Sequence, residues 1–166
     1  DWKWRSIGLI IHMAYEWAQR VGDMRTLQWS SVNLSAKRLD LEQSKRRAEV
    51  HIPIDDALCK MLAEQYETFG FQQYVVPAVE PHNGVYRPYP STDIHKLVNE
   101  VKAHAGLPPD ITAMDLRRTG ITRLVEGGAD TFSIMQVSGH SNPQSVKPYL
   151  VNTLTGATNA LASRKK

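Results

Sequence analysis

The chain has 166 residues, of which 42% are hydrophobic and 22% charged, and its formal net charge is +3. This size and balance fit one globular domain with a hydrophobic core. The longest early apolar run is broken by His12 and is too short to span a membrane. The single cysteine excludes an internal disulfide and a cysteine-rich metal site. The basic excess suits a polyanionic partner without requiring one.

Cellular location is suggested by two features. The first residues lack the apolar region of a signal peptide, and one unpaired cysteine is typical of a reducing compartment. We therefore expect a cytoplasmic protein with no membrane partner.

An amphipathic helix is predicted near the start of the chain. Apolar residues recur at intervals of three and four between Ile7 and Val21, which indicates one buried face. Ser6 is expected to cap this helix, and Gly22 to end it just after Arg20.

Polar and apolar residues alternate in residues 38–42 and 49–54, which is the two-residue period typical of a β-strand. This pattern predicts an antiparallel hairpin or small sheet with Lys45 near its turn. Asp55 is then expected to cap a helix that continues to Phe69. The side chains predicted to face inward from this helix are Leu58, Met61, Leu62 and Tyr66.

The second half of the chain is predicted to be mostly helical. Residues 71–90 contain four prolines and are expected to form a surface connection around a short strand at 74–76. Helices are expected at 92–105, 114–126, 131–137, 143–152 and 155–163. The predicted fold class is therefore α+β, mostly α, with one small antiparallel sheet.

One ordered set of polar residues could carry chemistry: Arg20, Lys45, Arg117, His140 and Tyr149. A phosphodiester repels nucleophiles because its oxygens are anionic, and the planar arginine fork matches two such oxygens. A tyrosine phenol can be the nucleophile, but its reference pKa near 10 means that it needs cationic neighbours or a base. Taken singly, each of these residues is as well explained by a surface or core role. We expect no metal site and no cofactor.

The order and local phrasing of these residues resemble the catalytic domain of the tyrosine recombinases, the phage integrase family. The likeness covers nearly the whole chain, and its last two phrases are specific. The phrases that carry it are Arg20-Val21-Gly22-Asp23, with Asp for the usual Glu; Gln43-Ser44-Lys45; Met114-Asp115-Leu116-Arg117 followed by Arg118-Thr119; and Gly139-His140-Ser141 with Tyr149.

The resemblance implies a role for each candidate. Tyr149 would attack a DNA phosphate and form a 3′-phosphotyrosine link. Arg20 and Arg117 would hold the nonbridging oxygens, and Lys45 would protonate the departing 5′ oxygen. His140 would hydrogen-bond the phosphate or its leaving oxygen. Such a site-specific DNA recombinase, or integrase, would need neither ATP nor a metal.

The resemblance also implies the wider organisation. Residues 1–166 would be the catalytic, C-terminal domain of a longer protein, with an integrase-like fold and a tail at about 153–166. The partner would be double-stranded DNA, with a homotetramer on paired recombination sites and a monomer for the isolated domain. The expected DNA-binding residues are Arg46, Arg47, Arg118 and Thr119.

One departure leaves an alternative open. Met114 occupies a position where relatives have histidine, and a thioether cannot transfer protons. The alternative is a catalytically inactive DNA-binding protein that keeps the recombinase fold. The intact set of five candidate residues favours the enzyme.

Overall fold

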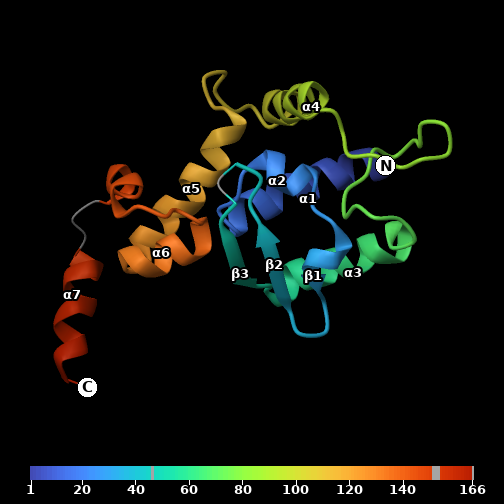
Figure 1. The fold of residues 1–166 in the computed structure, drawn as a ribbon. Coiled ribbons are helices and arrows are strands. Elements are labelled where there is room, and N and C mark those ends of the chain that lie inside the picture. Colours follow the sequence, from blue (N-terminus) through green and yellow to red (C-terminus); the bar gives the residue numbers. More distant parts are fainter. Residues whose placement is uncertain (46, 151–153, 166) are drawn as a thin grey trace.

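The computed structural model describes residues 1–45, 47–150 and 154–165 (Figure 1). Its first helix, α1 (Trp2–Glu16), starts earlier than predicted because the Asp1 carboxylate accepts a hydrogen bond from the backbone N–H of Lys3 at 2.9 Å. Ser6, the predicted cap, lies instead within the buried face of α1.

The end of α1 also differs from the prediction. Trp17 caps the helix, and Ala18 adopts a positive φ of 50°, which turns the chain out of the helical path. Arg20 then precedes a separate short helix, α2 (Val21–Arg25), so Gly22 lies inside a helix and does not end one. This break directs the chain so that Arg20 stands at the start of α2.

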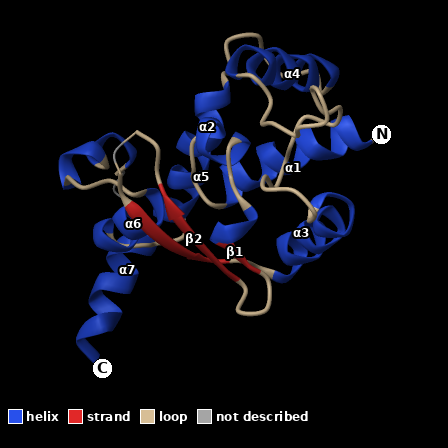
Figure 2. Cartoon of the chain, turned by 45° about the vertical axis from the view of Figure 1, so that its right-hand side comes forward, coloured by secondary structure: helices blue, strands red, loops and turns tan. Residues whose placement is uncertain are grey.

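The predicted hairpin is part of a three-stranded antiparallel sheet in the order β1-β2-β3. A short 3-10 helix, η1 (Trp29–Ser31), leads into β1 (Val32–Asn33), which pairs with β2 (Arg38–Glu42), and β2 pairs with β3 (Glu49–Pro53). Leu39 lies opposite Ile52 and Leu41 opposite Val50, and all four are buried. One face of the sheet therefore packs against the helical body (Figure 2).

Helix α3 (Asp56–Phe69) begins where predicted, because Asp55 accepts a hydrogen bond from the backbone N–H of Leu58 at 2.7 Å. Its inward face is narrower than predicted. Leu58 and Leu62 are buried, but Met61 is 37% and Tyr66 50% exposed. The prediction for Tyr66 is wrong because its ring packs edge-on against Trp29, with ring centroids 4.9 Å apart, at the rim of the core.

The strand predicted at 74–76 does not form. Tyr74 makes one isolated bridge to Gln28, while Val75 and Val76 are fully buried. Burial of this apolar segment therefore needs no strand ladder. The connection leads to α4 (Ser91–His104).

The remaining helices are α5 (Ala113–Glu126) and α6 (Thr131–Ser138). A capping box starts α5, in which Asp115 accepts hydrogen bonds from the backbone N–H and the hydroxyl of Thr112. These hydrogen bonds hold the pKa of the Asp115 carboxyl below its ordinary value. Asp130 caps α6 by accepting hydrogen bonds from the N–H groups of Phe132 and Ser133.

The C-terminal segment differs in part from the prediction. Two 3-10 turns, η2 (Pro143–Ser145) and η3 (Lys147–Tyr149), replace the predicted helix, and residues 151–153 lie outside the described residues. Helix α7 (Leu154–Ala162) is followed by η4 (Ser163–Lys165). It lies at the opposite end of the molecule from the N-terminus (Figure 1). No helix in the described ranges is long and apolar enough to cross a membrane.

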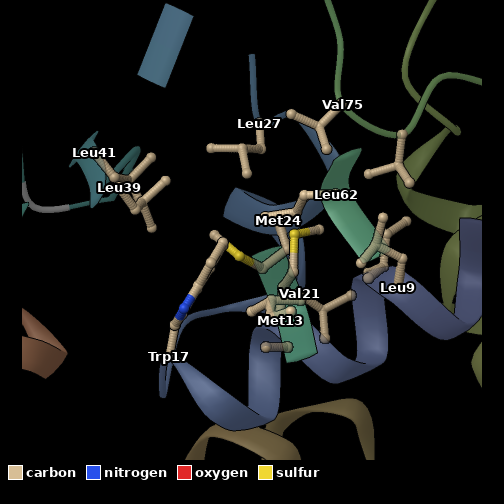
Figure 3. Close-up of a cluster of buried hydrophobic side chains, with 14 of the residues drawn as sticks. Leu9, Met13, Trp17, Val21, Met24, Leu27, Leu39, Leu41, Leu62 and Val75 are labelled. Atoms are coloured by element: carbon tan, nitrogen blue, oxygen red, sulfur yellow. The ribbon is translucent and has the colours of Figure 1, made fainter. Parts of the chain in front are cut away.

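Two apolar clusters hold these elements together. The larger one joins α1, α2, the sheet, α3 and α4, and Figure 3 shows Leu9, Met13, Leu39 and Leu62 gathered around Met24. The smaller one joins α5, α6 and the turn before η3, and its buried members are Ala18, Ile121, Val125, Ile134 and Val146. Ala18 places the break after α1 in the smaller cluster, so the two clusters meet at this point.

Close contact between α1 and α5 requires Gly120. A Cβ at this position would lie 2.4 Å from the backbone oxygen of Tyr15 and 3.3 Å from the Cα of Ala18. Gly120→Ala should therefore force the helices apart and lower the free energy of unfolding by about 3 kcal/mol, at the upper end of overpacking costs.

Urea denaturation measures this change. Gly8→Ala is the matched control. A Cβ at this position meets nothing within 4 Å, and the substitution removes a glycine from the interior of α1. That control should raise stability by up to ~1 kcal/mol. Equal stability of the Gly120→Ala variant and the unsubstituted chain would contradict the proposed close packing.

Candidate active site

All five candidate catalytic residues line one pocket of about 420 Å³. They come from five separate places: the start of α2, the β2–β3 turn, α5, the loop after α6, and η3. The remaining lining residues are Val21, Gly22, His95, Ala113, Met114 and Arg118. A larger cavity of about 620 Å³ between α1 and α4 is mostly apolar and includes none of the candidates.

Arg117 is the most buried of the candidates, with 9% of its surface exposed. Its Nη1 donates to the backbone oxygen of Ala18 at 3.1 Å, and its Nη2 donates to that of Ser138 at 2.7 Å. Both acceptors are neutral carbonyls, so these hydrogen bonds orient the guanidinium without neutralising its charge. The break after α1 and the end of α6 together position Arg117.

Arg20 is held by a glutamine and by a buried acid. Its Nη1 donates to Oε1 of Gln43 at 3.2 Å and lies 3.7 Å from Oδ2 of Asp23. The other Asp23 oxygen, Oδ1, accepts from the backbone N–H of Ser44 at 3.0 Å and from its hydroxyl at 2.6 Å. The Asp23 carboxylate therefore connects Arg20 to the turn that carries Lys45.

Lys45 is an exposed residue at the β2–β3 turn, next to the anchored Ser44. Lys45 lines the pocket from this turn. Arg47 follows in the same turn with a positive φ of 52° and pairs with Glu42 at 2.9 Å. Arg46 lies outside the described residues.

The hydrogen bonds of His140 identify its neutral tautomer. The hydroxyl of Ser138 donates to the backbone oxygen of Ile134 at 2.7 Å, and the same Oγ lies 2.7 Å from Nδ1 of His140. Since the hydroxyl has one proton, Nδ1 must be the donor in the second contact. A neutral His140 therefore carries its lone pair on Nε2, and a protonated one adds a second N–H donor.

Tyr149 ends η3 and is partly buried against the smaller apolar cluster. Its backbone N–H donates to the oxygen of Val146 at 2.9 Å, and Val146 is fully buried. The ring centroids of Tyr149 and His140 lie 6.5 Å apart. The buried valine therefore anchors the turn that carries the phenol.

The pocket is suited to bind an anion. Four of its lining residues carry guanidinium or ammonium groups: Arg20, Lys45, Arg117 and Arg118. None of the described lining residues is an aspartate or glutamate. Such a set can clamp the oxygens of a phosphate and stabilise the charge that develops when the phosphorus is attacked.

The predicted DNA-binding residues are less well gathered. Arg118 lines the pocket and lies 3.8 Å from Asp115. Thr119 is exposed on α5 but is not among the lining residues. Arg47 points from the neighbouring turn with 84% of its side chain exposed.

Several residues of the site were not identified from the sequence. His95 lines the pocket from α4, and Met114, which is 75% exposed, also lines it. No spacing within the sequence relates His95 to the other candidates. Gln43 and Ser138 were missed as well, since a buried polar side chain cannot be distinguished from an exposed one by residue type.

Comparisons with known proteins agree with this arrangement. A protein-family comparison matches residues 5–154 to the phage integrase family. The tyrosine recombinase XerC of Pediococcus pentosaceus is 26% identical over 152 residues, which cover 89% of this chain and 50% of that protein. The chain therefore spans about half the length of this relative.

Two solved structures share the fold. A crystal structure of XerA recombinase superposes with a TM-score of 0.74 at 17% identity, covering 98% of this chain and 57% of that one. A lambda integrase tetramer bound to a Holliday junction gives a TM-score of 0.68 at 20% identity, covering 88% of this chain and 42% of that one. With the family match over residues 5–154, these findings show that the chain belongs to the phage integrase family, the tyrosine recombinases.

Proposed function

We propose that residues 1–166 form the catalytic domain of a longer site-specific DNA recombinase, an integrase that cleaves and rejoins DNA through a 3′-phosphotyrosine intermediate. The observation that carries the proposal is the convergence of Arg20, Lys45, Arg117, His140 and Tyr149 on one pocket. Family membership supports the same reaction class.

In the proposed step, Oη of Tyr149 attacks the phosphorus of a DNA phosphodiester and the bond from phosphorus to the 5′ oxygen breaks. Arg20 and Arg117 bind the nonbridging oxygens, whose negative charge increases in the transition state. The ammonium of Lys45 gives a proton to the departing 5′ oxygen, which leaves as a hydroxyl. The phosphotyrosine keeps the phosphoester bond, so a 5′-hydroxyl from another strand can reverse the attack.

His140 is suited to contact the phosphate or its leaving oxygen. Its Nδ1 is committed to Ser138, which directs the reactivity of the ring to Nε2. A neutral Nε2 accepts the phenol proton or orients it, and a protonated one donates to a phosphate oxygen.

We further propose that the reaction proceeds without a divalent metal. Guanidinium and ammonium groups can supply the positive charge that a metal supplies in other phosphoryl transfers. The cationic lining of the pocket supports this assignment.

The alternative is an inactive DNA-binding protein with the same fold, and Met114 is the observation that favours it. The thioether offers no proton transfer where relatives have histidine. His95 places a second imidazole on the same pocket. The intact set of five candidates favours the enzyme.

Covalent capture distinguishes these two functions. The protein is incubated in EDTA with duplexes that are nicked close to the cleavage position and randomised around the nick, so that the short 5′-hydroxyl strand diffuses away and religation fails. We expect a covalent adduct that survives denaturation and yields a phosphotyrosine peptide containing Tyr149. Specific binding to selected duplexes without any adduct would support the inactive protein.

DNA-backbone contacts by the β2–β3 turn can be tested separately. Replacing Arg46 and Arg47 with alanine should weaken binding similarly for all sequences and reduce the slope of log K against log salt by ~0.9 per lost phosphate contact. Binding titrations over a range of salt concentrations measure the slope. Arg38→Ala is the matched control, because Arg38 pairs with Asp40 at the other end of β2. A loss confined to one sequence would show that the turn contacts base edges.

Assembly on DNA is proposed to depend on the C-terminal tail. Ala157 and Leu161 of α7 are exposed, and we propose that this helix packs on a neighbouring subunit in a homotetramer on paired sites. The isolated domain is expected to be a monomer by light scattering. Deleting residues 153–166 from the longer protein should leave single-site binding intact but remove tetramers on paired sites. Persistence of those tetramers would refute the role of the tail.

A further inference from the structure

One buried side-chain amide contacts several parts of the candidate active site. Gln43 is fully buried and lies between β2 and the turn that carries Lys45. Its Oε1 accepts from Nη1 of Arg20 at 3.2 Å. Its Nε2 donates to the backbone oxygen of Ser138 at 2.9 Å and to Oε1 of Gln19 at 2.5 Å. One amide therefore uses both its acceptor and its donors.

The backbone oxygen of Ser138 extends this network to the second arginine. It accepts from Nε2 of Gln43 at 2.9 Å and from Nη2 of Arg117 at 2.7 Å. A carbonyl oxygen has two lone pairs, so these two donors occupy both. The hydroxyl of the same serine holds Nδ1 of His140. Gln43 and Arg117 are thus fixed to one atom, and His140 to the same residue.

Gln43 also packs against the glycine that precedes His140. Gly139 has a positive φ of 70°, and a Cβ there would lie 2.6 to 2.7 Å from three atoms of the Gln43 amide. The backbone approaches the amide so closely that a side chain larger than hydrogen does not fit. A movement of Gln43 would therefore be transmitted to the loop that carries His140.

Gln19 supports the amide from the opposite side. It is also fully buried, and its Nε2 donates to the backbone oxygens of Trp17 and Val137, each at 2.7 Å. The two glutamines together join the end of α1, the end of α6 and the hairpin. A buried network whose polar groups are satisfied in this way holds its members in one geometry.

We propose that Gln43 is a positioning residue that fixes the positions of Arg20, Arg117 and His140 relative to the turn bearing Lys45. This inference rests on the proposed function, since these relative positions matter for attack on a phosphate. A displacement of about 1 Å in such a set can reduce a rate by ~100-fold, although no catalytic group is removed.

Gln43→Met tests the proposal, because methionine has a similar length but no amide. Gln65→Met is the matched control. Gln65 is also a buried glutamine, donating to the backbone oxygen of Val75 at 3.0 Å, but it lies on α3 away from the pocket. Both variants should lose stability. Only Gln43→Met should lose about 100-fold in the adduct rate at saturating nicked DNA.

A double-mutant cycle separates positioning from general destabilisation. Adding Arg20→Ala should slow the reaction much less in the Gln43→Met background than in the Gln65→Met background, because Arg20 is already displaced in the former. Gln43→Glu covers the case in which the methionine variant does not fold. It keeps the size and the acceptor for Arg20 but removes both donations from Nε2, and it should also slow the reaction.

A measurement without DNA tests the placement of the two arginines separately from the proposed function. In NMR spectra of the free protein, Gln43→Met should shift or broaden the guanidinium N–H signals of Arg20 and Arg117, and Gln65→Met should not. Unchanged arginine signals, or equal adduct rates for the two glutamine variants, would overturn the inference. If the unsubstituted protein forms no adduct, the proposed function fails, and the NMR signals alone decide the role of Gln43.

Discussion

Tyr149→Phe is expected to abolish the covalent adduct while leaving DNA affinity nearly unchanged. Only Oη is removed, so the attacking atom is lost, while the ring can keep its contacts with the smaller apolar cluster. Stability should change by less than ~1 kcal/mol, because the substitution preserves the volume of the ring. Adduct formation on nicked duplex, measured beside the dissociation constant, gives both quantities.

Tyr66→Phe is the matched control for this experiment. Tyr66 is half exposed on α3 and does not line the pocket, so the same loss of a hydroxyl there should leave the adduct intact. An adduct that persists in Tyr149→Phe and maps to another tyrosine would keep the reaction class but refute Tyr149 as the nucleophile.

Arg117→Ala should reduce the adduct rate at saturating DNA by roughly 10³-fold, because charge stabilisation dominates phosphoryl transfer. The substitution also leaves the carbonyls of Ala18 and Ser138 without their guanidinium donor. We therefore expect a loss of stability as well, of ~1–3 kcal/mol for unsatisfied buried acceptors. Single-turnover rates measured well below the melting temperature separate the two effects.

Two further substitutions sharpen this result. Arg117→Lys keeps the charge but not the planar fork, so it should recover only part of the rate. Arg123→Ala removes an exposed arginine of the same helix, which pairs with Glu126 at 3.5 Å, and should leave the rate unchanged. Similar rates for Arg117→Ala and Arg123→Ala would rule out a role for Arg117 at the phosphate.

Predictions from local sequence patterns were wrong where contacts with distant residues determined the backbone conformation. The periodic apolar run to Val21 suggested one helix, but the chain breaks at Ala18, which is buried in the smaller cluster. Val75 and Val76 have the composition of a strand, yet they are buried without a ladder. In each case packing against distant residues, which no local window contains, decided the conformation.

The sequence by itself determined the elements that depend on neighbouring residues. Asp55 marked the start of α3 through an interaction within one turn. The alternation in β2 and β3 marked the buried face of the hairpin, because successive side chains of a strand point to opposite faces. The five polar residues that line the pocket were also identified, because their types and order suggested one chemistry.

Only the tertiary structure decided how those five residues are held. Gln43 meets the backbone of Ser138 across 95 residues of sequence, and Arg117 meets that of Ala18 across 99. Their acceptors are backbone carbonyls, which every residue possesses, so the residue types in the sequence do not indicate these contacts. The geometry of the site therefore depends on the folded backbone, because a hydrogen bond to a carbonyl is specified by position and not by side-chain identity.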